Sequence, residues 1–397
     1  MKIMKKIKNL IFIFESFLTK YDFERYGIDF YISQGLKIKI LNISPITRRS
    51  YFNGEKEKSH FVKNFQKNCY SLEDIKKEFF EYKNTCAASI VHIDNFEYDY
   101  KVRKILKSNN ILIIKHFFGG QPFQKKSIIE IFSLIFSDFF GALKKLIEIL
   151  NFLKLKLAKN EEPDLIFYTG SKFKPSKKIK SVSLPSFEYD KINFLSSKKS
   201  KNIINDEFAL YIDVPYRHSD QYEISKRFPK EVPCSFEEYY GTLNRFFKNF
   251  EKVSKLKLCI SSHPRANYKN NPYDAYKLFE NKTYELSADS KCRVVLLHSS
   301  LAINYPVLLK KPVIFLTQSK FTYSNKKHVI DLSRFFEKKP IEIDQDNFDE
   351  KIYKNQLKMN IDIYNSYKNK FISEKDFKNT SYEIIYNTLI NNNDNQR

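Results

Sequence analysis

The sequence predicts an α/β protein built from two Rossmann-like domains that face a cleft. The chain has 397 residues, of which 42% are hydrophobic, whereas one domain usually contains about 100 to 200 residues. Short apolar runs, typical of buried parallel strands, alternate with helix-like segments. This alternation restarts after a basic stretch rich in Ser and Asn, residues 196–206, which indicates an interdomain linker.

These features set the expected domain boundaries. We expect an N-terminal Rossmann-like domain over residues 1–195, a linker over 196–206 and a second Rossmann-like domain over 207–375. Residues 376–397 are expected to form a C-terminal helix that returns to the first domain, followed by a frayed Asn-rich tail.

The first half of the chain is expected to form βαβ units. Strands are predicted at 10–14, 37–42, 88–93, 111–116, 164–168 and 179–184, with helices at 23–34 and 71–82. The fourth strand is followed by Gly119 and Gly120. Open α/β sheets bind ligands beyond the carboxyl ends of their strands, so this Gly pair is either part of a site or an ordinary turn.

The second half repeats the pattern. Strands are predicted at 208–212, 257–261, 293–297 and 312–317, and helices at 236–253 and 301–310. Pro306 lies inside the last helix and implies a kink or a later start.

The charge and the cysteine content indicate which partners and which cellular compartment to expect. A net charge of +23 predicts an anionic partner such as a phosphorylated substrate or an anionic lipid surface. The lysines are spread along the chain without a basic arm, so nucleic acid is not an expected partner. Five cysteines without a CxxC pair fit free thiols in a reducing compartment. Residues 2–14 resemble the start of a signal peptide, but no small-residue cleavage site follows, so a cytoplasmic protein is expected.

The apolar stretch 127–159 is a candidate membrane-contacting segment. Acidic and basic residues interrupt it, so it never reaches the roughly 20 nearly uncharged residues of a membrane span. Its apolar residues recur at helical spacing and its second half is rich in Lys, which suits a helix lying on an anionic membrane at the inner face of the cytoplasmic membrane. The other interpretation is a pair of core helices with a solvated basic face.

A polar turn between two predicted strands is the best candidate for anion binding. Ser299 and Ser300 follow the strand at 293–297 and precede the helix-like segment. Serine hydroxyls, free backbone N–H groups and the helix dipole suit a phosphate at such a position. A plain helix cap explains the same serines equally well.

A second motif, Ser262-His263-Pro264-Arg265, follows the strand at 257–261. There, His263 could donate a hydrogen bond to a phosphoryl oxygen or leaving group, and Arg265 would add a fixed positive charge. Taken alone, a His-Pro pair is a common chance occurrence.

These motifs carry a family resemblance. Ser262-His263-Pro264-Arg265, residues 279–286, His298-Ser299-Ser300 and residues 302–315 resemble the carboxyl-terminal domain of bacterial surface-carbohydrate biosynthesis proteins. The wider similarity is to bacterial sialyltransferases, polysialyltransferases and Kdo transferases of the GT-B fold, and it is firmest over residues 208–317. The resemblance implies that six residues hold the cytidine nucleotide of a CMP-activated sugar: His263, Pro264, Arg265, His298, Ser299 and Ser300.

The acidic motif that supplies the base in some sialyltransferases is missing, so candidate bases are inferred from position. Asp213 ends the strand at 208–212, Asp94 follows the strand at 88–93, and Glu15 ends the first strand. Carboxylates there would project toward the expected cleft. The alternative for each is a helix cap or an ion pair. His263 completes the candidate catalytic set.

Metal use is not expected, because the DxD pattern Asp344-Gln345-Asp346 lies near the carboxyl end and the His residues are scattered. A Gly-rich phosphate loop is also missing from the sequence, which disfavours kinases, NTPases and dehydrogenases. No cofactor beyond the nucleotide-sugar donor is expected.

The function that these patterns favour is transfer of a nonulosonate or Kdo from a CMP-sugar onto a bacterial surface polysaccharide or glycolipid. Two alternatives remain open. One is a CDP-polyol phosphotransferase of the teichoic-acid type, and the other is a non-catalytic protein that binds anionic glycan or nucleic acid.

Overall fold

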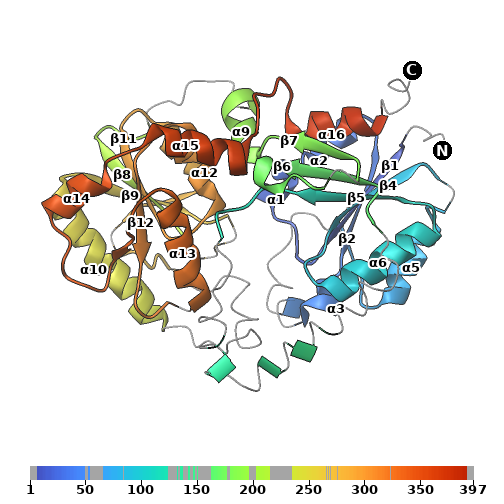
Figure 1. Ribbon diagram of the computed structural model, residues 1–397, viewed down its shortest axis with the longest axis horizontal. Helices are drawn as coiled ribbons and strands as arrows, with labels where there is room; N and C mark the ends of the chain where they lie inside the picture. The colour runs from blue at the N-terminus through green and yellow to red at the C-terminus, as the bar shows by residue number, and fades with distance from the viewer. Residues whose placement is uncertain are drawn as a thin grey trace.

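The computed structural model contains two parallel β-sheets, one in each half of the chain (Figure 1). It describes residues 7–49, 52–53, 66–83, 85–123, 162–176, 179–195, 203–214, 235–264, 266, 268, 270–274, 276–321 and 323–390, with isolated positions between 132 and 150. The architecture confirms the predicted fold class of two Rossmann-like α/β domains.

The first sheet has seven strands in the order β3-β2-β1-β4-β5-β6-β7. All its strand pairings are parallel. The central strands are apolar on both faces because helices cover both sides of the sheet. The strands are β1 (Asn9–Phe14), β2 (Lys37–Asn42), β3 (Gln66–Asn68), β4 (Ala87–His92), β5 (Leu112–Phe117), β6 (Leu165–Thr169) and β7 (Ser181–Leu184).

Several helices of the first domain begin at polar caps. Ser71 and Asp74 form a capping box at the start of α5, and Asn95 accepts a hydrogen bond from the Tyr98 N–H at the start of α6. The helical segments are α1 (Lys20–Arg25), α2 (Ile28–Ser33), α3 (Ser44–Thr47), α5 (Leu72–Phe80), α6 (Phe96–Ser108), η1 (Ser171–Phe173), α9 (Phe187–Asp190) and η2 (Lys191–Leu195).

The second sheet has six parallel strands in the order β10-β9-β8-β11-β12-β13. Its longest helix, α10, starts at a capping box of Ser235 and Glu238 and packs an aromatic face into the core. The strands are β8 (Phe208–Ile212), β9 (Lys257–Ser262), β10 (Leu278–Glu280), β11 (Cys292–Leu297), β12 (Val313–Thr317) and β13 (Ile341–Glu342). The helical segments are α10 (Phe236–Ser254), α11 (Thr283–Ala288), η4 (Leu301–Ile303), α12 (Asn304–Leu308), α13 (Tyr323–Phe335), α14 (Glu350–Gln356), α15 (Ile361–Tyr367), η5 (Lys368–Ile372) and α16 (Ser381–Ile390).

Each sheet has one point at which its strand order reverses. In the first sheet this point lies between β1 and β4, and in the second between β8 and β11. Open α/β sheets bind ligands in the crevice outside the carboxyl ends of the strands at such a point. The topology therefore predicts that ligands bind beside the residues that follow β1, β4, β8 and β11.

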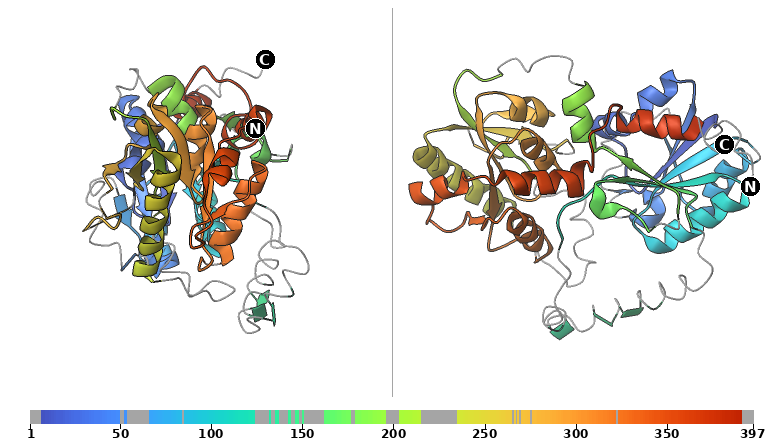
Figure 2. Two further views of the ribbon diagram at one scale, coloured as in Figure 1. Left: turned by 90° about the vertical axis from the view of Figure 1, so that its left-hand side faces the viewer. Right: turned by 45° about the horizontal axis from the view of Figure 1, so that its top comes forward.

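The chain returns from the second domain to the first near its end. Figures 1 and 2 show α15 on the second domain and α16 lying against the first. Ile385 and Leu389 of α16 belong to the same buried cluster as Ile28 and Tyr31 of α2. The Ser381 N–H also donates to the Asp190 carboxylate at 2.9 Å.

Glycines of the first domain make room for this returning segment. Gly119 and Gly170, which follow β5 and β6, have φ of +87° and +77°. A Cβ atom on Gly170 would lie 2.3 Å from the Lys370 carbonyl oxygen, and one on Gly119 would lie 2.8 Å from that of Phe371. The backbone of η5 therefore packs directly on the carboxyl edge of the first sheet.

We expect Gly170→Ala to lower the free energy of unfolding by about 3 kcal/mol, because the new methyl group would add backbone strain to overpacking. Urea denaturation measures the effect. Gly241→Ala is the matched control, because nothing lies within 4 Å of a Cβ atom at that position in α10. It should raise the free energy of unfolding slightly, since Ala is more favourable than Gly in a helix by about 0.8 kcal/mol. Equal effects of the two substitutions would contradict the close approach of η5.

Two helices differ from the sequence-based expectation. The predicted helix at 23–34 is divided into α1 and α2, because Gly27 adopts φ +63° and the Tyr382 ring occupies the place of a Cβ there. The predicted helix at 301–310 is a 3-10 turn, η4, followed by the short α12, which contains Pro306. A proline cannot donate the backbone hydrogen bond that a longer helix would require.

Candidate active site

The carboxyl edges of the two sheets meet at a side-chain contact. The Ser299 hydroxyl, just after β11, donates to Gln121 Oε1, which follows β5, at 2.8 Å. A second contact joins the domains nearby, where Asn304 Nδ2 donates to Glu188 Oε2 at 2.9 Å. The predicted serine turn therefore lies at the junction of the two domains.

Asp213 occupies the end of β8 at the second switch point. Its side chain is fully buried, whereas the sequence predicts a carboxylate projecting into a cleft. The Tyr268 hydroxyl donates to Oδ2 at 2.7 Å and the Tyr273 hydroxyl donates to Oδ1. Burial raises the pKa of Asp213, and these hydrogen bonds oppose that rise.

Asp213 also connects directly to the His-Pro motif. The His263 N–H donates to Asp213 Oδ2 at 3.2 Å, and the His263 carbonyl oxygen accepts the Ala266 N–H at 2.8 Å. The turn that carries His263 and Pro264 is thus anchored to the buried carboxylate. Arg265 lies outside the described residues.

His298 follows β11, the strand adjacent to β8 at the switch point. Its Nδ1 lies 2.7 Å from the Leu316 carbonyl oxygen. Since a carbonyl oxygen can only accept, Nδ1 carries the proton. Burial lowers the pKa of His298 to about 4, so the ring is neutral at pH 7 and Nε2 is an acceptor. Within the described part of the chain, Nε2 is buried without a hydrogen-bond partner.

The two serines of the turn have different partners. The Ser300 side chain accepts the Ala302 N–H at 3.2 Å and caps η4, which matches the helix-cap interpretation. Ser299 makes the contact with Gln121, whose Nε2 is buried without a partner among the residues the structure describes. The turn therefore presents one serine to its own helix and one to the other domain.

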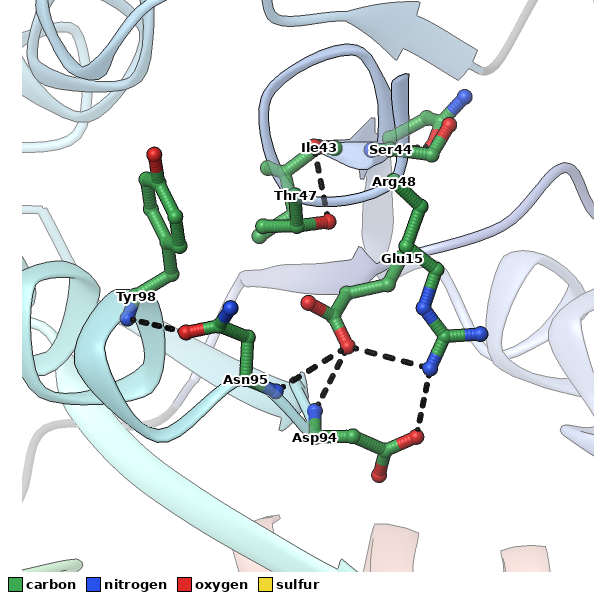
Figure 3. A network of polar contacts seen from close by, with 9 residues as sticks. Glu15, Ile43, Ser44, Thr47, Arg48, Asp94, Asn95 and Tyr98 are labelled. Carbon is green, nitrogen blue, oxygen red and sulfur yellow. Dashed lines mark hydrogen bonds and ion pairs between the residues drawn. The ribbon is translucent and has the colours of Figure 1, made fainter. Parts of the chain in front are cut away.

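The first switch point carries an ionic network (Figure 3). Arg48 Nη2 lies 2.8 Å from Asp94 Oδ2 and 3.5 Å from Glu15 Oε2. The Asp94 side chain is 90% exposed, whereas Glu15 is 5% exposed. Burial raises the pKa of Glu15, while the Asp94 N–H and the Arg48 charge oppose that rise.

The structure brings some predicted site residues together and leaves others apart. Asp213 and His263 are in direct contact, and His298, Ser299 and Ser300 share the turn after the neighbouring strand. Asp94 lies at the other switch point, beyond the carboxyl end of the first sheet. Sequence reasoning missed Arg48, Gln121, Tyr268 and Tyr273, and only the glycine pair preceding Gln121 gave a local signal.

The first aspartate of the DxD pattern, Asp344, holds the turn after β12. The Asp344 carboxylate accepts the Ser319 N–H at 3.0 Å, in the turn after β12. Among the described residues there is no group of His, Cys, Asp and Glu side chains that could hold a metal ion.

Comparisons with known proteins give similarity of fold at low sequence identity. No family model matches the sequence, and no curated protein sequence matches it. Acinetobacter baumannii MurG is 7% identical over 97% of this chain and 99% of its own, with a TM-score of 0.46. Staphylococcus aureus MnaA, in a structure with UDP, is 13% identical over 98% and 99%, with a TM-score of 0.48. Arabidopsis thaliana UGT89C1 is 8% identical over 98% and 99%, with a TM-score of 0.49.

Proposed function

We propose that this protein is a glycosyltransferase that moves a nonulosonate or Kdo from a CMP-activated sugar onto a bacterial surface polysaccharide or glycolipid. One observation carries the proposal: two switch points, each lined by polar or ionisable side chains, belong to sheets whose carboxyl edges are joined by the contact of Ser299 with Gln121. Because open α/β sheets bind ligands at such switch points, a pair of them suits two substrates, one on each domain.

The second domain would bind the donor. His298 is neutral, so its Nε2 would accept a hydrogen bond from a ligand O–H or N–H group and would not neutralise a phosphate. His263, held by the buried Asp213, and the serine turn would orient the phosphate. The bond from the anomeric carbon to the phosphate oxygen breaks, and CMP leaves with the bonding electrons.

The first domain would bind the acceptor and supply the base. An acceptor hydroxyl attacks the anomeric carbon, and a carboxylate takes its proton. Of the two aspartates considered, Asp94 is exposed at its switch point, whereas the oxygens of Asp213 already accept three hydrogen bonds. The geometry favours Asp94 as the base and Asp213 as the residue that positions His263.

A transfer assay with several donors tests this function. Purified protein would be incubated with CMP-nonulosonate, CMP-Kdo, CDP-glycerol, CDP-ribitol and UDP-sugars, each with a lipid-linked glycan acceptor. Release of CMP coupled to growth of the acceptor is the expected result. Release of CMP from CDP-glycerol or CDP-ribitol together with extension of the acceptor by a polyol phosphate would favour the phosphotransferase. Absence of turnover with every donor would contradict an enzymatic function.

We also propose that the protein docks on an anionic membrane at the inner face of the cytoplasmic membrane. Most of residues 127–159 lie outside the described residues, but six positions there expose apolar side chains: Phe132, Phe136, Leu143, Leu146, Ile147 and Leu150. The sequence of the same stretch is rich in Lys. Exposed apolar residues together with basic charge support binding to anionic lipid headgroups. No described helix is long and apolar enough to cross a bilayer.

Replacing these side chains should weaken membrane binding. We expect Phe136→Ser together with Leu150→Ser to lower the affinity for phosphatidylglycerol vesicles at least ~100-fold, measured by co-sedimentation, because burial of each apolar side chain contributes about 2 kcal/mol and each 1.4 kcal/mol is about tenfold. Phe80→Ser is the matched control, since Phe80 is an exposed aromatic residue on α5. Equal vesicle binding by both variants would contradict the proposed docking surface.

A further inference from the structure

Glu15 is a buried carboxylate at the first switch point, next to the candidate base Asp94. It directly follows β1, the strand beside β4 at the first switch point. Its charge is largely removed from water, and burial of this kind is unfavourable unless the carboxylate gains specific partners. The groups that contact its Oε2, which are the Asp94 and Asn95 N–H groups and Arg48, either belong to the Asp94 segment or contact Asp94.

One connection runs through the main chain. Glu15 Oε2 accepts the Asp94 N–H at 2.8 Å and the Asn95 N–H at 3.4 Å. These bonds fix the backbone between the end of β4 and the start of α6 (Figure 3). Helix capping does not explain them, because the Asn95 side chain already caps α6 through the Tyr98 N–H.

The other connection runs through Arg48. Its guanidinium lies between Glu15 Oε2 and Asp94 Oδ2, at 3.5 Å and 2.8 Å. An exposed ion pair by itself holds a side chain only weakly. The buried carboxylate of Glu15 gives Arg48 a fixed second partner, and Arg48 in turn holds the Asp94 carboxylate at the first switch point.

We infer that Glu15 is a positioning residue for the acceptor-activating carboxylate, Asp94. It acts through the Asp94 main chain and through Arg48, without touching the substrate itself. This inference rests on the proposed glycosyl transfer and on Asp94 as its base.

The test compares two substitutions of buried carboxylates in the same domain. Glu15→Gln retains an oxygen that can accept the Asp94 N–H but removes the charge that holds Arg48. Glu78→Gln is the control, because Glu78 is equally buried and its salt bridges are to Lys39 and Lys67, in β2 and β3. We expect Glu15→Gln to lower kcat at least ~10-fold with an unchanged donor KM, since small displacements of reacting groups reduce rates up to about 10²-fold.

Four further results distinguish the possible outcomes. Amide hydrogen exchange at Asp94 should be faster in Glu15→Ala than in the wild type, which reports the main-chain bond independently of turnover. Wild-type turnover that survives Glu15→Gln in a folded protein would overturn this inference alone. A wild-type protein that transfers no sugar would contradict the proposed function and, with it, the catalytic part of this inference. Equal losses of kcat in Glu15→Gln and Glu78→Gln would show a general structural effect and would also overturn it.

Discussion

Asp94→Asn should lower the transfer rate by about 10²- to 10⁴-fold, which is the usual contribution of a positioned general base. The amide cannot take a proton from the acceptor hydroxyl, although it has nearly the same shape. Donor binding should be unchanged, because Asp94 belongs to the first domain and the proposed donor site to the second. Steady-state kinetics with saturating donor measures the rate, and calorimetry measures the affinity for donor.

The control for Asp94 is Glu97→Gln. Glu97 is an exposed acidic residue in the first turn of α6, the helix that follows Asp94, and pairs with Lys101. Its replacement should leave kcat within about twofold, since surface substitutions of this kind have small effects. If Asp94→Asn retained the wild-type rate, the base would have to be another group.

Asp213→Ala should lower the free energy of unfolding by about 3 kcal/mol, because buried donors left without an acceptor each cost about 1 to 3 kcal/mol. The hydroxyls of Tyr268 and Tyr273 and the His263 N–H would all lose their acceptor. The turn that carries His263 would then be released, so donor affinity should fall about tenfold, which corresponds to roughly 1.4 kcal/mol. Asp213→Asn retains one acceptor oxygen and should have a smaller effect on both quantities.

The control for Asp213 is Asp206→Ala. Asp206 pairs with Lys257, which begins β9, at the amino end of the same sheet. This exposed residue should affect neither the unfolding midpoint nor donor affinity. Wild-type donor affinity in a folded Asp213→Ala variant would show that Asp213 does not position His263.

Most of the fold could be predicted because its strands are short continuous apolar runs. β8, for example, is buried along its whole length and was expected at the same residues. Errors occurred where tertiary contacts override local preference. Gly27 divides a helix because the Tyr382 ring, from the far end of the chain, occupies the place of a side chain.

The site was predictable only as separate positions at strand ends. The sequence placed His263, His298 and Asp94 correctly beyond their strands, because the carboxyl ends of parallel strands share one edge. The partners of these residues could not be predicted. Gln121 and Ser299 are 178 residues apart in the chain, and no local pattern specifies such a contact.

The identity of the bound nucleotide tests the central claim most directly. A thermal-shift panel would compare CMP, CDP, UDP, GDP and ADP on the wild type, His263→Ala and Ser300→Ala. A ligand at 100 times its Kd stabilises the native state by about 2.7 kcal/mol, so a selective shift is measurable. We expect CMP alone to stabilise the wild type and both substitutions to remove that stabilisation. A preference for UDP or GDP would contradict the CMP-sugar donor, and no response to any nucleotide would contradict a nucleotide-sugar transferase.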